Sequence, residues 1–365
     1  MELLRLAGPP GVGKSTTAWT VARRFADDGM STGYVDTDQL GMCYPAPDDD
    51  PDRWALKERA LAGVAEEFRR AGVERLVVSG VAWPDDPPPR IAGVSVRSLW
   101  LDASEHSRRE RLGARGTDGE QLSEMLSAGT AEAERVHSAW ERVDTDGLSP
   151  SETVGEVLMR WRPTAVENRR PGSERSMRLG AAGGDRLLWL TGLRLAGASR
   201  IGWEIATREW REGTRTGFID LAQLSFAWNI DEAVGPASLA RVHRCFREVG
   251  ADLLVVVAPI EIEPEAARAV LPNSDVSSVR LSPSAADLRR HAHFRRSGEG
   301  PALAGDDVIG ATDAEVEVIL RTADLQSSLP LREHEVSVRT RGLSPADAAA
   351  AVRRGAGWSA VLDRP

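Results

Sequence analysis

The amino-acid sequence predicts an α/β protein of two tandem domains, each built on a five-stranded parallel sheet with helices packed on both faces. Three observations carry this prediction: a glycine-rich phosphate-binding motif, an alternation of short apolar runs with helical patterns, and an internal repeat. Strands that alternate with helices of this length pair in parallel through right-handed crossovers. The chain has 365 residues, enough for two domains that each bury a core.

The motif is the segment 8–16, GPPGVGKST, which follows the apolar run 3–7 and leads into a helical pattern. It fits G-x-x-x-x-G-K-[ST] in the strand-to-helix context that gives this pattern its meaning. Its glycines let backbone N–H groups surround a phosphate, and the following helix directs its positive end at the same anion. We expect Lys14 to reach the β- and γ-phosphates of a nucleotide. The residues expected to bind the nucleotide are Gly8, Gly11, Val12, Gly13, Lys14, Ser15 and Thr16.

The first half alternates between strand and helix patterns along its length. Strands are predicted at 3–7, 33–36, 76–80, 96–101 and 140–145. Helices are predicted at 16–26, 54–71, 104–114, 123–137 and 151–161. Segments rich in Pro and Asp, at 43–53 and 82–90, are predicted loops. Residues 163–185 shift to Pro, Gly, Arg, Ser and Asn without periodicity, which predicts a linker between a first domain at 1–162 and a second at 186–365.

Composition excludes several classes of protein. The net charge of −9 argues against a general nucleic-acid or anionic-membrane surface, which would need a basic patch. Two cysteines, Cys43 and Cys245, lie far apart and outside any C-x-x-C, so neither a disulfide framework nor a structural zinc site is indicated. No apolar run approaches about 18 residues and no secretion signal is recognisable, so we expect a cytoplasmic protein without a membrane span.

The second half of the chain repeats the first. With Gly192 placed under Gly8, 12 of the 33 positions from 8 to 40 are identical without a gap, and a further block sets 61–80 over 239–258 with 9 of 20 identities. We interpret the repeat as a tandem duplication and expect the two halves to pair within the chain. The second copy retains glycines, tryptophans and apolar runs, together with Ser199 and Asp220, and loses charged groups. Lys14 becomes Ala198, Asp38 becomes Ala222 and Arg111 becomes Ala292.

These losses fall on groups that phosphoryl transfer would use, so we expect the chemistry in the first half and a degenerate, catalytically silent second half. Transfer requires alignment and charge neutralisation. We assign Asp38 to orient the acceptor hydroxyl and act as a general base. Ser15 is assigned as a Mg²⁺ ligand and Asp36 as part of the Mg²⁺ shell through water, because ligands of open α/β sheets lie outside the carboxyl ends of the strands. The alternative for Asp36 is a structural cap at the strand end.

Arg111 and Arg115 share one helix face at i, i+4 spacing, where a closing lid would bring them over the phosphates. The alternative is a solvated basic helix face. Trp83, Arg53 and Arg90 lie in the two loops that would wall an acceptor pocket, and sequence alone does not choose among them.

The motif at 8–16, Asp36-Thr37-Asp38 after the second strand, Arg111 and Arg115 in a lid position, and the segment 143–149 together resemble the P-loop kinases of small molecules. That group includes shikimate kinase, gluconate kinase, adenylylsulfate kinase and chloramphenicol phosphotransferase. The resemblance implies a sheet in the order 2-3-1-4-5, ATP with Mg²⁺, and adenine held between the lid and residues 144–148. It covers 1–162 well and the second half as a decayed, pseudokinase-like copy. No acceptor signature of a single member is present.

The sequence therefore predicts a kinase that moves the γ-phosphate of Mg-ATP to a hydroxyl of a small metabolite. One alternative is a nucleotide-binding switch or regulatory ATPase, in which ATP controls the interface of the two halves. A further alternative is a nucleic-acid 5′-end kinase, which the acidic charge balance disfavours.

Overall fold

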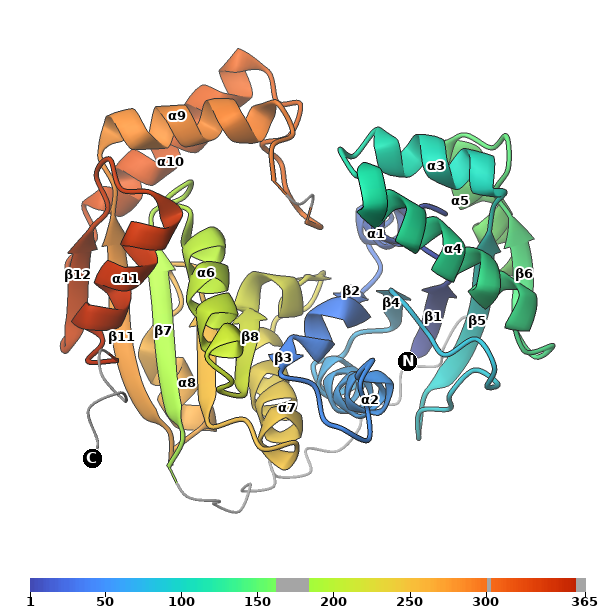
Figure 1. Ribbon diagram of the computed structural model, residues 1–365, viewed down its shortest axis with the longest axis horizontal. Coiled ribbons are helices and arrows are strands. Elements are labelled where there is room, and N and C mark those ends of the chain that lie inside the picture. Colours follow the sequence, from blue (N-terminus) through green and yellow to red (C-terminus); the bar gives the residue numbers. More distant parts are fainter. Residues whose placement is uncertain (162–183, 301–302, 359–365) are drawn as a thin grey trace. The chain divides into compact units, whose positions relative to one another are not determined.

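The computed structural model describes residues 1–161, 184–300 and 303–358 (Figure 1). The chain divides into two compact units. Among the described residues, the first unit holds 1–41, 50–161 and 225–234, and the second holds 42–49, 184–224 and 235–358. Each unit thus contains one short segment from the opposite half of the sequence. The expected linker at 163–185 falls, except for its last two residues, outside the described part of the chain.

The first unit is a six-stranded sheet covered by helices. Its sheet order is β6-β5-β1-β4-β2-β9, and every pair is parallel except β2 with β9. The strands are β1 (Glu2–Ala7), β2 (Thr32–Asp36), β4 (Arg75–Ser79), β5 (Ser95–Asp102), β6 (Glu141–Asp144) and β9 (Ala227–Trp228). The helices are α1 (Lys14–Asp27), η1 (Thr37–Gly41), α2 (Trp54–Arg70), α3 (Glu105–Gly113), α4 (Gly119–Arg135) and α5 (Pro150–Arg160).

The sequence patterns explain these elements. Strands β1 and β4 are almost continuously buried, as expected for strands covered on both faces of a parallel sheet. Helix α1 buries Ala18, Val21 and Ala22 on one side, which follows its apolar spacing. Helix α5 begins at Pro150 behind a capping box in which Ser149 and Glu152 satisfy each other's backbone N–H groups.

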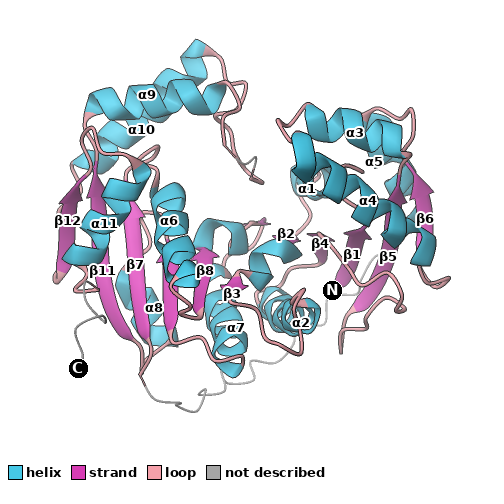
Figure 2. Ribbon diagram, in the orientation of Figure 1, coloured by secondary structure: helices cyan, strands magenta, loops and turns pink. Residues whose placement is uncertain are grey.

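The second unit repeats this architecture. Its sheet order is β12-β11-β7-β10-β8-β3, and all pairs are parallel except β8 with β3. The strands are β3 (Cys43–Tyr44), β7 (Arg186–Gly192), β8 (Thr216–Asp220), β10 (Leu253–Val257), β11 (Asp275–Ser282) and β12 (Glu335–Arg339). The helices are α6 (Ala198–Arg211), η2 (Leu221–Leu224), α7 (Gly235–Glu248), α8 (Pro264–Val270), α9 (Ala285–Arg296), α10 (Asp313–Ser327) and α11 (Pro345–Gly355). Figure 2 marks the strands of both sheets in magenta and the helices in cyan.

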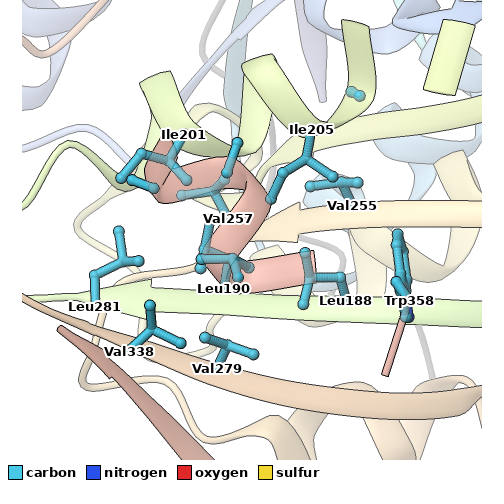
Figure 3. Close-up of a cluster of buried hydrophobic side chains, with 14 of the residues drawn as sticks. Leu188, Leu190, Ile201, Ile205, Val255, Val257, Val279, Leu281, Val338 and Trp358 are labelled. Atoms are coloured by element: carbon cyan, nitrogen blue, oxygen red, sulfur yellow. The ribbon is translucent and has the colours of Figure 1, made fainter. Parts of the chain in front are cut away.

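One buried core of the second unit lies between its sheet and the helices α6 and α11. Figure 3 shows side chains of α6 directed at those of the central strands, with Trp358 closing one end of the cluster. The labelled residues are Leu188, Leu190, Ile201, Ile205, Val255, Val257, Val279, Leu281, Val338 and Trp358. In the part of the chain that is described, no helix combines the length and apolar character needed to cross a membrane.

The prediction of five-stranded sheets is wrong by one strand, because the sheet of each unit has six strands. The α/β class and the mostly parallel sheets are confirmed, and the five parallel strands of the first unit, numbered along the chain, lie across the sheet as second, third, first, fourth and fifth. The sixth strand of each sheet comes from a segment predicted as loop or left unassigned. Strand β3 lies inside the Pro- and Asp-rich segment 43–53. Two-residue strands carry no periodicity, so the sequence pattern did not reveal them.

Equivalent elements of the two halves are separated by the same number of residues, from the first helix of each half to the short strand that it contributes to the other unit. Helices α1 and α6, strands β2 and β8, and strands β3 and β9 each begin 184 residues apart, as the pairs Lys14 and Ala198, Thr32 and Thr216, and Cys43 and Ala227 show. Strand β9 pairs with β2 in the same register in which β3 pairs with β8. The exchange of short strands is therefore reciprocal.

Candidate functional site

The loop between β1 and α1 has the backbone shape that the motif predicts. Gly11 and Gly13 adopt left-handed conformations with φ of 86° and 92°. Gly8 packs so closely on the backbone of Leu101 that a Cβ at this position would clash with its carbonyl oxygen. Helix α1 starts directly after Gly13 with no side chain capping its N-terminus. Its first N–H groups are thus available to an anion held by the loop.

Lys14 lies at the start of α1, where the motif requires a cation. Its Nζ donates a hydrogen bond of 2.9 Å to the carbonyl oxygen of Pro9, across the loop. Burial lowers the pKa of Lys14, while the carboxylates of Asp38, Asp36 and Glu132 act in the opposite direction. A phosphate in the loop would favour the charged form of this lysine.

Asp36 ends β2 and faces the loop. Its Oδ2 accepts hydrogen bonds of 3.2 Å from the hydroxyls of both Ser15 and Ser79, and its Oδ1 accepts one of 2.9 Å from the backbone N–H of Asp38. Burial, reinforced by the nearby Asp38, raises the pKa of Asp36 to about 6. The Asp36 carboxylate thus also caps the end of β2 by accepting the backbone N–H of Asp38, which is the structural role expected as the alternative to metal binding.

The Ser15 hydroxyl and the Asp36 carboxylate offer the hard oxygen ligands that Mg²⁺ prefers. Within residues 1–161, 184–300 and 303–358, no group of three or more His, Cys, Asp or Glu side chains could hold a metal ion. A Mg²⁺ ion held by Ser15 and Asp36 would therefore need further oxygen ligands from outside these two side chains. The donor set fits such an ion, and the metal role of Ser15 and Asp36 stays a prediction.

The raised pKa of Asp36 predicts how Asp36→Asn changes stability with pH. The folded state binds the Asp36 proton more tightly than the unfolded state, so this contribution to stability is present below about pH 4 and is lost as the pH rises to about 6. The free energy of unfolding of Asp36→Asn, taken relative to that of the wild type, should therefore be on the order of 2 kcal/mol larger at pH 8 than at pH 4.5. Urea unfolding at the two pH values measures this difference. An equal effect of the substitution at both values would contradict it.

Asp38 is the second residue of η1 and lies two residues after the end of β2. Its carboxylate accepts from Lys57 Nζ at 3.4 Å, and its side chain is 45% exposed while that of Lys57 is 9% exposed. The Lys57 stem packs on Gly41, where a Cβ would lie 2.6 Å from Lys57 Cε, and its Nζ lies 5.1 Å from the centre of the Trp54 ring. Lys57 thus fixes one oxygen of Asp38 and leaves the carboxylate open on its other side.

Sequence reasoning did not assign Lys57 to the site. A signal was present, because Lys14 and Lys57 are the chain's only two lysines and both are near these acidic residues. The spacing of 19 residues between Asp38 and Lys57 does not itself indicate an ion pair.

An aromatic pair adjoins the Asp38–Lys57 ion pair. The rings of Trp54 and Trp83 meet edge to face with centroids 5.6 Å apart, and Trp83 is 40% exposed. Trp83 lies in the loop after β4, the strand next to β2, so it is on the carboxyl side of the sheet with Asp38. Of the other two loop residues, Arg53 directly precedes α2 in a left-handed conformation, and Arg90 lines a pocket with Ile91 and Val94.

The two lid arginines are placed differently. The Arg111 guanidinium donates to the side-chain and backbone oxygens of Thr145, at 3.0 and 2.7 Å, and to the carbonyl oxygen of Val12 at 3.4 Å. Arg111 thus joins α3 to both the β1–α1 loop and the turn after β6. Arg115 is exposed beyond the end of α3, and its charge contributes to lowering the pKa of Lys14. Contact of either arginine with a phosphate stays a prediction.

The corresponding loop of the second unit has left-handed residues at the same two positions, but two of its backbone groups are bonded to side chains of α9 and α10. Leu195 and Gly197 are left-handed with φ of 67° and 80°, matching Gly11 and Gly13. The backbone N–H of Arg194 donates to Gln326 Oε1 at 2.6 Å, and the carbonyl oxygen of Leu195 hydrogen-bonds His291 Nδ1 at 2.8 Å.

One side-chain contact of the first-unit loop is retained in the second unit, and the lysine is not. Ser199 still bonds Asp220 at 2.7 Å, as Ser15 bonds Asp36. The helix α6, however, begins with Ala198 where α1 begins with Lys14.

Comparisons with known proteins add the following. No protein-family model matches the chain, and no curated protein matches it. Similar solved structures include a gluconokinase from Sinorhizobium meliloti 1021, at 22% identity over 44% of this chain and 90% of that chain, with a TM-score of 0.30. Another is an unliganded sugar kinase from Janibacter sp. HTCC2649, at 19% identity over 44% of this chain and 93% of that chain, with a TM-score of 0.31. At these TM-scores, neither similarity bears on the chemistry of the site.

Proposed function

We propose that the protein is an ATP-dependent phosphotransferase that moves the γ-phosphate of Mg-ATP to a hydroxyl of a small-molecule acceptor. The observation that carries this proposal is the grouping of Lys14, the Ser15–Asp36 oxygen pair and the half-exposed Asp38 at the carboxyl ends of β1 and β2. Open parallel sheets bind their ligands at this edge. Phosphate binding and acceptor binding would thus occupy neighbouring positions in one unit.

In this proposal the loop N–H groups and Lys14 hold the β- and γ-phosphates and neutralise charge that develops during transfer. Ser15, with Asp36 behind it, would hold a Mg²⁺ ion, which would supply positive charge against the charge that develops on the phosphate during transfer. Arg111 already contacts the loop carbonyl of Val12, so a small movement of α3 would bring its guanidinium or that of Arg115 toward the phosphates.

Asp38 is assigned to the acceptor. Its free oxygen orients the acceptor hydroxyl and accepts its proton as the new O–P bond forms and the bond between the γ-phosphorus and the bridging oxygen of ADP breaks. The ion pair with Lys57 keeps the carboxylate in one orientation. The exposed ring of Trp83 would cover one side of an acceptor bound at Asp38.

We also propose that the two halves arose by tandem duplication and that the second unit has no catalytic activity of its own. The constant spacing of 184 residues and the equivalent sheet orders support the duplication. The backbone groups of Arg194 and Leu195 are bonded to the side chains of Gln326 and His291, and α6 begins with Ala198, which supports the loss of phosphate binding.

The test of this function uses the full chain, Mg-ATP and a library of hydroxyl-bearing metabolites. We expect ADP to form with at least one acceptor, and mass spectrometry of that acceptor to show one added phosphoryl group. A rise in melting temperature with ATP, without ADP above background for any acceptor, would contradict a kinase and favour a regulatory nucleotide-binding protein.

A further inference from the structure

We propose that the second half of the chain helps to build the unit that carries the candidate site: its segment 225–234 completes the sheet of that unit and thereby positions Asp36. The effect on turnover rests on the whole of the proposed function, whereas the effect on Mg-ATP binding rests only on the part of it that assigns nucleotide binding to the β1–α1 loop. In this assignment Phe226, Trp228 and Asn229 are positioning residues, because they act on the site through β2 and α1.

The segment first supplies the outer strand of the sheet. Thr32 pairs with Trp228 and Gly33 with Ala227, and the backbone N–H of Tyr34 donates to the carbonyl oxygen of Phe226 at 2.9 Å. Strand β2 would otherwise be an edge strand with unpaired N–H and C=O groups, which leaves a strand free to shift or to pair elsewhere. The strand that ends in Asp36 is thus held on both sides.

The segment also supplies aromatic side chains to the phosphate-binding helix. Trp19 of α1 packs edge to face on Phe226, with ring centroids 4.8 Å apart, on Trp228 at 5.4 Å and on Tyr34 at 5.3 Å. The Arg23 guanidinium, one turn further along α1, lies 5.2 Å from the Trp228 ring centre. Since Trp19 is one helical turn after Ser15, these contacts fix the helix that carries Lys14 and Ser15.

Asn229 binds the turn between α1 and β2. Its side-chain amide donates to the carbonyl oxygens of Ala26 at 2.7 Å and Met30 at 2.9 Å, and its own carbonyl accepts from the Ser31 hydroxyl at 2.9 Å. Asn229 has a φ of 58°, a left-handed conformation that Asn tolerates better than most residues. The last turn of α1 and the start of β2 are thereby tied to one residue of the second half.

A chain of hydrogen bonds connects the exchanged segment with the site. Tyr34, whose backbone bonds Phe226 and whose ring contacts Trp19, shares a hydrogen bond of 2.9 Å between its hydroxyl and that of Ser79. Ser79 in turn donates to Asp36 Oδ2 at 3.2 Å. A displacement of β2 would therefore move Asp36 relative to Ser15, and misplacements on the scale of 1 Å are costly to catalysis.

The second unit offers a matched comparison, because β3 occupies the corresponding position on β8. The backbone N–H of Phe218 donates to the carbonyl oxygen of Met42 at 2.7 Å, and the ring of Tyr44 packs on that of Trp210 with centroids 4.7 Å apart. Trp210→Ala removes an aromatic contact of this exchanged strand without touching the first unit. It serves as the control for Trp228→Ala.

The experiment uses the full chain with Mg-ATP as the probe and measures melting temperature, the Kd of Mg-ATP by calorimetry and, where an acceptor is known, kcat. Both alanine variants should melt below the wild type. Trp228→Ala should raise the Kd of Mg-ATP and lower kcat by about tenfold or more, while Trp210→Ala should leave both values unchanged. Trp228→Phe, which retains a ring, should recover most of the loss.

The inference would be overturned if Trp228→Ala bound Mg-ATP with the Kd of the wild type, or if Trp210→Ala lost as much Mg-ATP affinity as Trp228→Ala. If Trp228→Ala does not fold, Asn229→Gly is the variant to measure. Glycine retains the left-handed backbone and removes the two amide hydrogen bonds. A raised Kd of Mg-ATP in this variant supports the inference, and an unchanged Kd overturns it. Should the wild type bind Mg-ATP but phosphorylate no acceptor, the kinase proposal fails while the Kd comparison still tests the role of the segment.

Discussion

Lys14→Ala is expected to abolish Mg-ATP binding by the full chain and to leave the fold intact. The Lys14 ammonium is held across the β1–α1 loop by the carbonyl oxygen of Pro9, and burial lowers its pKa, so the charged form carries a cost that a bound phosphate would offset. Loss of a charge-assisted contact in such a position costs on the order of 2–5 kcal/mol, which corresponds to at least about 30-fold in Kd. Because burial disfavours the charged form of Lys14, its removal should not lower the melting temperature measured without ATP.

The control for Lys14→Ala is Ser199→Ala in the loop of the second unit. Ser199 corresponds to Ser15 and bonds Asp220, but the N–H of Arg194 in its loop is already bonded to Gln326. We expect turnover of Ser199→Ala to equal that of the wild type. Comparable losses of turnover in Lys14→Ala and Ser199→Ala would show that the second loop takes part in catalysis. The proposal of a catalytically inactive second unit would then be withdrawn.

Asp38→Asn is expected to reduce kcat by about 10²–10⁴-fold, the range typical of a general base, with little change in the Kd of Mg-ATP. The amide keeps the size of the side chain but cannot accept the proton of the acceptor hydroxyl. It also removes the charge that pairs with Lys57, so the ammonium loses a partner at 3.4 Å. Steady-state kinetics with the identified acceptor, together with calorimetry for Mg-ATP, separate these effects.

Asp49→Asn is the control for Asp38→Asn, since it makes the same change in charge at an exposed position of the second unit. It should retain wild-type kcat. A kcat for Asp38→Asn within about threefold of the wild type would assign proton acceptance elsewhere and leave Asp38 as the residue that orders η1.

The sequence predicts the fold well where one pattern extends over a whole element. Helix α2 is expected at 54–71 and observed at Trp54–Arg70, and the apolar run 76–80 is observed as Arg75–Ser79. Helix α4 begins at Gly119 rather than at 123, because its first turn is polar and carries no apolar periodicity. The exchanged strands could not be predicted, since their pairing depends on partners 170 or more positions away and not on local sequence.

The candidate site is predictable to the extent that its residues follow strands directly. Lys14, Ser15, Asp36 and Asp38 come within a few residues of β1 or β2, so topology alone brings them to one edge of the sheet. Lys57 and Trp54 reach that edge from α2, whose position depends on packing against η1. The hydrogen bonds of Arg111 to Thr145 depend likewise on tertiary contacts that helix spacing does not contain.

The reciprocal exchange of β3 and β9 also imposes an order on folding during synthesis. The first unit lacks its outer strand until residue 228 has left the ribosome, although its other strands are complete at residue 144. Segment 42–49, in turn, must wait for β8 to be made. During this interval both β2 and the unpaired segment expose backbone groups that can pair with other chains. Nascent chains released between these points should therefore depend more on chaperones than the finished protein does.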